Sequence, residues 1–122
     1  MIVAGFGFRT GAAPSSLRDA FEVVRADCVS EITALAAPAD KAQPLAPLAA
    51  ELGVLLVAVA PEMLERMPTA TVSPASLAAR RTGSVAEAAA LAAAGPGARL
   101  LIARCVSSDR MATCAIAQGI ST

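Results

Sequence analysis

The sequence predicts an α/β fold: a three-layer α/β/α sandwich whose mainly parallel sheet is closed by a C-terminal antiparallel hairpin. Apolar runs of strand length alternate with segments of helical periodicity. Short loops join them, which favours right-handed crossovers and parallel strands with helices on both faces. Two further apolar runs flank a turn at Asp109 and Arg110, which is typical of a hairpin. Since the 122 residues contain no repeat or linker, we expect a single domain over residues 1–122.

The first half of the chain opens with a strand, a helix and a second strand. Residues 2–8 are apolar and partly β-branched, as strands are, and apolar residues then recur at helical spacing from Pro14 to about Asp27. Residues 30–36 alternate enough to predict the second strand. A helix should follow it.

That second helix is expected to begin late. Asp40 is a candidate N-cap, but Pro44 and Pro47 delay the regular part of the helix until one of them occupies its first turn. The helix is expected to end at Leu52, because Gly53 favours the left-handed conformation that follows many helices.

The second half continues the alternation. Residues 54–59 predict a third strand buried on both faces, and residues 61–67 predict a short helix. Ser73, followed by a proline, predicts the N-cap of a helix through Arg80. An alanine-rich helix is expected to open at Ser84 and to stop at residues 95–97, and the hairpin strands are expected at residues 99–106 and 112–118.

Composition excludes several classes of protein. The formal net charge is zero and only 2% of residues are aromatic, so the chain lacks the basic stripe and the stacking platforms of a nucleic-acid-binding protein. The longest clean apolar run, residues 54–60, is too short to span a membrane. The first residues lack the pattern of a secretory signal, so we expect a cytoplasmic protein.

No metal site and no cofactor are predicted. The chain has no histidine, which removes the commonest metal ligand and the usual general base at neutral pH. Its three cysteines, Cys28, Cys105 and Cys114, are widely spaced. The expected hairpin places Cys105 opposite Cys114, where reduced thiols are favoured in the cytoplasm and a disulfide is the alternative.

A candidate ligand site lies where parallel strands end. Ligands of open α/β sheets bind at the carboxyl ends of the strands, here at residues 7–13, 38–41 and 60–62. The first of these loops carries Gly5, Gly7 and Gly11, with Arg9 and Thr10 between them. Glycine amides and a guanidinium suit an anion, whereas the structural alternative is a tight turn with close helix packing. The spacing differs from the dinucleotide-binding pattern, so a nucleotide is the weaker reading.

Further candidates come from the second loop and the alanine-rich helix. Lys41 is the only lysine in the chain and lies at the mouth of the second strand-to-helix loop. Thr82 and Ser84 offer hydroxyls at a helix start. Ser84 and Glu87 have the spacing of a capping box, in which each side chain bonds the other residue's backbone N–H. Glu87 and Asp40 are also weak candidates for a catalytic carboxylate, although both have structural explanations as caps.

The most distinctive part of the chain is the segment TGSVAEAAALAAAGPGARLLIARCVSSDRMATCAIAQG at residues 82–119. Its order of residues resembles the CobE/CbiG C-terminal family of cobalamin (vitamin B12) biosynthesis. The first strand running into Gly5–Gly11 and the second ending at residues 36–41 agree with it. The resemblance covers nearly the whole chain and implies a role in building the corrin ring.

The resemblance also implies a ligand. Precorrin intermediates carry acetate and propionate arms, so we expect the chain to bind a precorrin or other corrinoid through cationic groups, as an accessory or carrier protein of the aerobic pathway. Other enzymes of that pathway are candidate partners, and a homo-oligomer remains open. The alternatives are a hydrolase that opens a precorrin lactone and releases acetaldehyde, with Glu87 or Asp40 activating water, and a small nucleotide-binding or scaffold domain.

Overall fold

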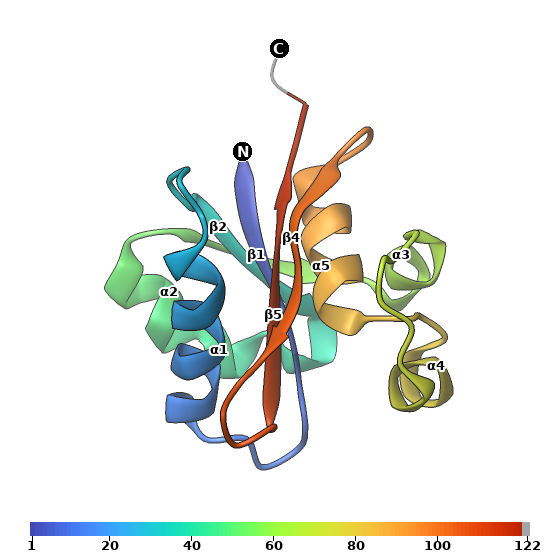
Figure 1. The fold of residues 1–122 in the computed structure, drawn as a ribbon, viewed down its shortest axis with the longest axis horizontal. Coiled ribbons are helices and arrows are strands. Elements are labelled where there is room, and N and C mark those ends of the chain that lie inside the picture. The colour runs from blue at the N-terminus through green and yellow to red at the C-terminus, as the bar shows by residue number, and fades with distance from the viewer. Residues whose placement is uncertain (121–122) are drawn as a thin grey trace.

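The computed structural model describes residues 1–120 and contains one five-stranded sheet with helices on both faces (Figure 1). The strands are β1 (Ile2–Phe8), β2 (Ala34–Pro38), β3 (Leu55–Val59), β4 (Arg99–Val106) and β5 (Ala112–Gln118). The helices are α1 (Pro14–Ala26), α2 (Ala46–Leu52), α3 (Pro61–Arg66), α4 (Pro74–Arg80) and α5 (Val85–Ala94), with 3-10 turns η1 (Ala39–Lys41) and η2 (Gln43–Leu45). The predicted fold class is confirmed.

The direction of the strands brings the loops after the parallel strands and the turn of the hairpin to the same end of the sheet, called here the shared edge. The sheet runs β3-β2-β1-β5-β4, with β1, β2 and β3 parallel, β5 antiparallel to β1, and β4 antiparallel to β5. Because β5 is reversed, the turn of the closing hairpin lies at the same edge as the carboxyl ends of the parallel strands. The loops expected to carry the ligand site and the hairpin turn therefore meet.

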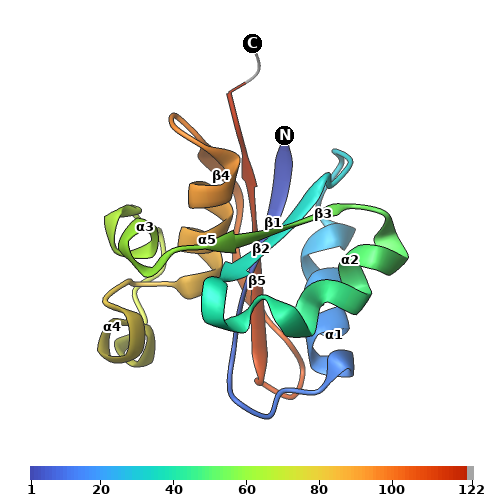
Figure 2. The same cartoon turned by 180° about the vertical axis from the view of Figure 1, so that it is seen from behind.

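The two faces of the sheet pack against different helices (Figures 1 and 2). Along β1, Ala4 and Phe6 join the cluster that includes α1 and α2, while Val3 joins the cluster that includes α5. Phe6 stacks on Phe21 of α1 with ring centroids 6.4 Å apart. Strand alternation thus divides the apolar core into two layers.

The alanine-rich helix α5 lies unusually close to β1. A Cβ atom on Gly5 would lie 2.2 Å from the carbonyl oxygen of Ala86 and 2.4 Å from the backbone nitrogen of Ala90. Both alanines are completely buried. The backbones of α5 and β1 are therefore in contact, because the side chains of α5 are small and Gly5 has none.

Three expectations about the elements were wrong in detail. The second strand begins at Ala34 rather than at residue 30, because its neighbour β1 begins at Ile2 and pairs Val3 with Ala34. β3 is not buried on both faces: it is an edge strand, and the Leu55 side chain is 62% exposed. Asp40 makes no side-chain cap and lies within the first turn of η1.

Other local signals are confirmed. Gly53 ends α2 in the left-handed region with φ of 70°, and Pro47 lies in the first turn of that helix. The Ser73 hydroxyl caps α4 by accepting a bond from the Ser76 backbone N–H. Cys105 and Cys114 are Cα partners across the hairpin, and both are free thiols. Within residues 1–120, no helix is long and apolar enough to cross a bilayer.

The contact between β1 and α5 makes Gly5 the position least tolerant of a side chain. We expect Gly5→Ala to lower the free energy of unfolding by about 3 kcal/mol or more, because the new methyl group would overlap backbone atoms that cannot move independently. Gly7→Ala is the matched control, since its Cβ would approach side-chain atoms of Val85 and Thr113 at 3.0 and 3.1 Å. Urea unfolding measures both, and equal losses would contradict the backbone-contact explanation.

Candidate functional site

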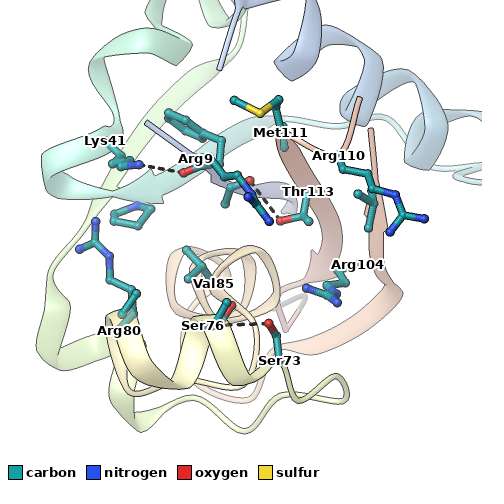
Figure 3. A pocket seen from close by; sticks show the side chains of 17 residues that line it. Arg9, Lys41, Ser73, Ser76, Arg80, Val85, Arg104, Arg110, Met111 and Thr113 are labelled. Atoms are coloured by element: carbon teal, nitrogen blue, oxygen red, sulfur yellow. Dashed lines mark hydrogen bonds between the residues drawn. The ribbon is translucent and has the colours of Figure 1, made fainter. Parts of the chain in front are cut away.

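A cavity of about 450 Å³ opens at the shared edge of the sheet (Figure 3). We call it the basic pocket. Its walls come from the ends of β1 and β2, the turn η1, helix α4, the start of α5, and the closing hairpin. It is lined by Gly7, Phe8, Arg9, Pro38, Lys41, Ser73, Ala75, Ser76, Ala79, Arg80, Val85, Arg104, Val106, Arg110, Met111, Ala112 and Thr113.

The charges that line the pocket all have one sign. Five of the ten basic residues of the chain line it, and none of the ten acidic residues does. The five are Arg9, Lys41, Arg80, Arg104 and Arg110. A cleft lined by one sign of charge and backed by apolar groups concentrates the electric field and attracts ligands of the opposite charge. The arrangement therefore favours an anion with an apolar body.

Arg9 follows β1 and extends across the pocket opening in Figure 3. Its backbone N–H donates to the Met111 carbonyl at 2.9 Å, which ties the end of β1 to the hairpin. Lys41 is held more firmly: its ammonium donates to the Phe8 carbonyl at 2.8 Å and lies 5.2 Å from the Phe8 ring centroid. Arg9 is thus the freer of these two cations, while Lys41 also fastens η1 to β1.

Arg104 reaches the pocket because β4 is irregular. The pairing of β4 with β5 shifts between Ile102 and Cys105, so an extra residue on β4 forms a β-bulge. Within the bulge, Arg104 donates its backbone N–H to Glu87 of α5 at 2.9 Å. The bulge fixes the Arg104 backbone to α5, and its side chain enters the pocket from the β4 side (Figure 3).

The hairpin loop is fastened to α1. The Asp109 carboxylate accepts hydrogen bonds from the hydroxyls of Ser107 and Ser16, and the Asp19 carboxylate accepts from both the backbone N–H and the hydroxyl of Ser108. The hydrogen bonds from Ser107 and Ser16 lower the pKa of Asp109, and those from Ser108 lower the pKa of Asp19. Arg110 lies between these contacts in a left-handed conformation, with φ of 61°.

Glu87 of α5 is a buried carboxylate, with no exposed surface. It accepts hydrogen bonds from the backbone N–H groups of Ala70, Thr71 and Arg104 and from the Thr71 hydroxyl, at 2.7 to 2.9 Å. Burial by itself raises the pKa of Glu87, but the bonds from Arg104, Thr71 and Ala70 outweigh it and leave the pKa below its ordinary value.

Half of the predicted capping box is present. The Ser84 hydroxyl accepts from the Glu87 backbone N–H at 3.3 Å. The reciprocal bond was predicted wrongly, because the Glu87 carboxylate turns to the segment before α4 and to β4 instead. Glu87 therefore joins three segments that are distant in sequence rather than capping its own helix.

The comparisons with known proteins identify the family. Residues 2–117 match the family described as "Cobalamin synthesis G C-terminus". The chain belongs to this family. A comparison with curated proteins found no match.

Solved structures of cobalamin biosynthesis proteins share the fold. The crystal structure of CobE, described as a protein from the cobalamin (vitamin B12) biosynthetic pathway, has a TM-score of 0.86 and 31% identity over 100% of this chain and 92% of that one. Cobalamin biosynthesis protein chiG from Agrobacterium tumefaciens str. C58 has a TM-score of 0.74 and 35% identity over 99% and 100%. A putative cobalamin biosynthesis protein G homolog from Sulfolobus solfataricus, at 22% identity, shares the fold over 95% of this chain and 36% of its own, with a TM-score of 0.72.

The structure brings together only some of the residues predicted to bind a ligand. Gly7, Arg9 and Lys41 line the basic pocket, together with Val85 at the start of α5. The other predicted ligand-binding residues do not line it. Gly5, Thr82 and Ser84 are buried, where Gly5 serves helix packing and Ser84 serves the cap, and Thr10 and Gly11 form an exposed turn outside the pocket.

Neither catalytic candidate is placed to act as a base in the basic pocket. Glu87 has no exposed surface, and its two oxygens accept four hydrogen bonds. Asp40 forms a two-pronged ion pair with Arg80, whose hydrogen bonds lower the pKa of Asp40. A carboxylate with a lowered pKa is a weak general base. The geometry thus gives both residues structural explanations.

Sequence reasoning missed Arg80, Arg104 and Arg110. The predicted hairpin offered a signal for Arg104 and Arg110, because a turn next to an antiparallel strand lies at the carboxyl edge of the parallel strands. The nine arginines among the ten basic residues were a second, weaker signal. Arg80 had no such signal, since the position of α4 depends on contacts distant in sequence.

We expect substitutions of Glu87 to destabilise the protein in a graded way. Glu87→Ala should lower the free energy of unfolding by about 4 kcal/mol, because the donors of Ala70, Thr71 and Arg104 lose their acceptor at once. Glu87→Gln should cost about 2 kcal/mol, since its amide NH₂ faces one of those donors. Ser84→Ala, which removes the single cap bond, is the control at about 1 kcal/mol. Urea unfolding that gave Glu87→Ala no greater loss than Ser84→Ala would refute the tethering role.

The lowered pKa of Glu87 predicts acid destabilisation. The unfolded chain restores its ordinary value of 4.5, so the stabilisation is fully present above pH 4.5 and is lost as the pH falls through the lower folded pKa. We expect the free energy of unfolding to fall in this window, and to fall less in Glu87→Gln. Asp19, Asp40 and Asp109 also lose stabilisation in acid, so the difference between parent and variant isolates Glu87. If urea unfolding showed the free energy of unfolding falling equally with pH in the parent and in Glu87→Gln, this role of Glu87 would be contradicted.

Proposed function

We propose that this chain binds a carboxylated corrin intermediate of cobalamin biosynthesis in the basic pocket, as an accessory or carrier protein. The observation that carries the proposal is the composition of the lining: five cationic side chains and no carboxylate. Acetate and propionate arms are the groups that such a lining would neutralise. Arginine suits this task because its fork of N–H donors matches a carboxylate with two parallel bonds.

The apolar part of the pocket supports the same ligand. Val85, Val106, Met111 and Pro38 line it alongside the cations. A corrin ring is a largely apolar body with charged arms, so both parts of the ligand find a complementary surface. The start of α5 adds the positive end of a helix dipole, which also favours negative charge.

Equilibrium dialysis with cobyrinic acid, a corrin whose arms end in carboxylates, tests the proposal. The absorbance of the corrin in the visible range reports the bound fraction. Binding is expected to weaken as salt is added, because salt screens the charges. The methyl ester of the same corrin is the neutral control and should bind much more weakly. Acetaldehyde released from a lactone-bearing precorrin would instead indicate a hydrolase, and retention of nucleotides alone would indicate a nucleotide-binding domain.

Arg9 and Arg104 are the cations whose loss should weaken binding most. Their side chains enter the pocket from different sides and have no acidic partner among residues 1–120. We expect Arg9→Met and Arg104→Met each to weaken cobyrinic acid binding roughly tenfold, which corresponds to about 1.4 kcal/mol.

The matched control for these variants is Arg66→Met, an exposed arginine of α3 outside the pocket, which removes the same charge. It should change binding little. Equal effects of all three variants would mean that only net charge matters, and unchanged binding in Arg9→Met and Arg104→Met would place the ligand elsewhere.

A further inference from the structure

One cation of the basic pocket differs from the other four. Arg80 alone has an acidic partner within ion-pair distance among residues 1–120. Its Nη1 and Nη2 atoms donate to Oδ1 and Oδ2 of Asp40 at 2.8 and 2.7 Å. These two parallel bonds are the geometry in which an arginine receives a free carboxylate. The pair therefore displays a carboxylate bound to a pocket arginine.

The two partners lie on different sides of the pocket boundary. Arg80 lines the pocket and its side chain is only 21% exposed, whereas Asp40 does not line it and is 62% exposed. A released Asp40 side chain would be hydrated at once. Ion pairs with an exposed partner contribute little net stability, because water and salt compete with them. Exchange of Asp40 for another carboxylate is therefore inexpensive.

Arg80 also lies on an element that is not anchored in the core. It ends α4, a helix with no buried residue. By contrast, the Arg9 backbone is bonded to Met111 and the Arg104 backbone to buried Glu87. The Asp40–Arg80 pair joins α4 to the turn η1 across the pocket wall. When that pair opens, the Arg80 guanidinium is free to receive another carboxylate.

From these observations we infer that Arg80 forms a carboxylate subsite of the basic pocket and that Asp40 is its resident competitor. In the free protein the Asp40 carboxylate is bound to the Arg80 guanidinium. In the complex a carboxylate arm of the ligand replaces it, and Asp40 turns to solvent. The inference deepens the proposed function and rests on it.

Asp40→Asn is the decisive variant, measured by equilibrium dialysis with cobyrinic acid. Removing the competing carboxylate should tighten binding roughly two- to fivefold, the ratio that corresponds to an exposed ion pair. Glu51→Gln is the matched control. It removes the same charge and breaks the Arg18–Glu51 pair, also 2.7 Å long, which lies outside the pocket. It should leave binding unchanged.

A double-mutant cycle separates competition from a general field effect. In an Arg80→Met background, Asp40→Asn should no longer tighten binding, because the subsite is gone. Persistent tightening in that background would show that Asp40 acts only through its charge and would overturn the inference, as would unchanged or weaker binding in the single variant. If Arg9→Met weakens binding while Asp40→Asn has no effect, the proposed function stands and this inference fails. A parent protein that does not bind cobyrinic acid contradicts both.

Discussion

The buried carboxylate of Glu87 is the interaction on which the walls of the pocket depend. It binds the segment that leads into α4 through Ala70 and Thr71, and it binds β4 through Arg104. A charge with no exposed surface is stable only while its hydrogen bonds persist, since losing one leaves it poorly solvated. The start of α5, the approach to α4 and the bulge of β4 are therefore held in one arrangement. The bulge in turn sets where the Arg104 side chain lies.

The strand topology brings the five cations of the basic pocket together. Arg9 comes from the end of β1, Lys41 from η1, Arg80 from α4, Arg104 from β4 and Arg110 from the hairpin loop. These segments span most of the chain. They meet because β5 runs antiparallel to β1, so the hairpin turn lies at the carboxyl edge of the parallel strands. A parallel pairing at that position would have sent the turn to the opposite edge. A ligand site at this edge is the general rule for such sheets, and here the hairpin extends it.

Local signals predicted the elements well, and long-range contacts limited the prediction of the site. The Ser73 cap, the Gly53 terminus and the hairpin follow from residues adjacent in sequence. The start of β2 depends on where β1 begins, and the exposure of β3 depends on whether another strand covers it; neither is encoded locally. Glu87 shows the limit most clearly. Its spacing from Ser84 fits a capping box, yet donors from two distant segments offer its carboxylate four bonds in place of one.

The two sides of the pocket differ in how firmly they are held. The hairpin loop is fastened to α1 through Asp109 and Asp19, whereas α4 buries no residue and meets η1 through the Asp40–Arg80 pair. For the proposed ligand this difference has a use. A fixed wall can set the register of the carboxylate arms, because the Arg104 backbone is hydrogen-bonded to buried Glu87. The wall formed by α4 can then adjust to a rigid ring of irregular outline, since α4 has no buried residue of its own. Binding would thus combine a preorganised half with an adaptable half, and in the adaptable half the ligand carboxylate must displace Asp40 from Arg80.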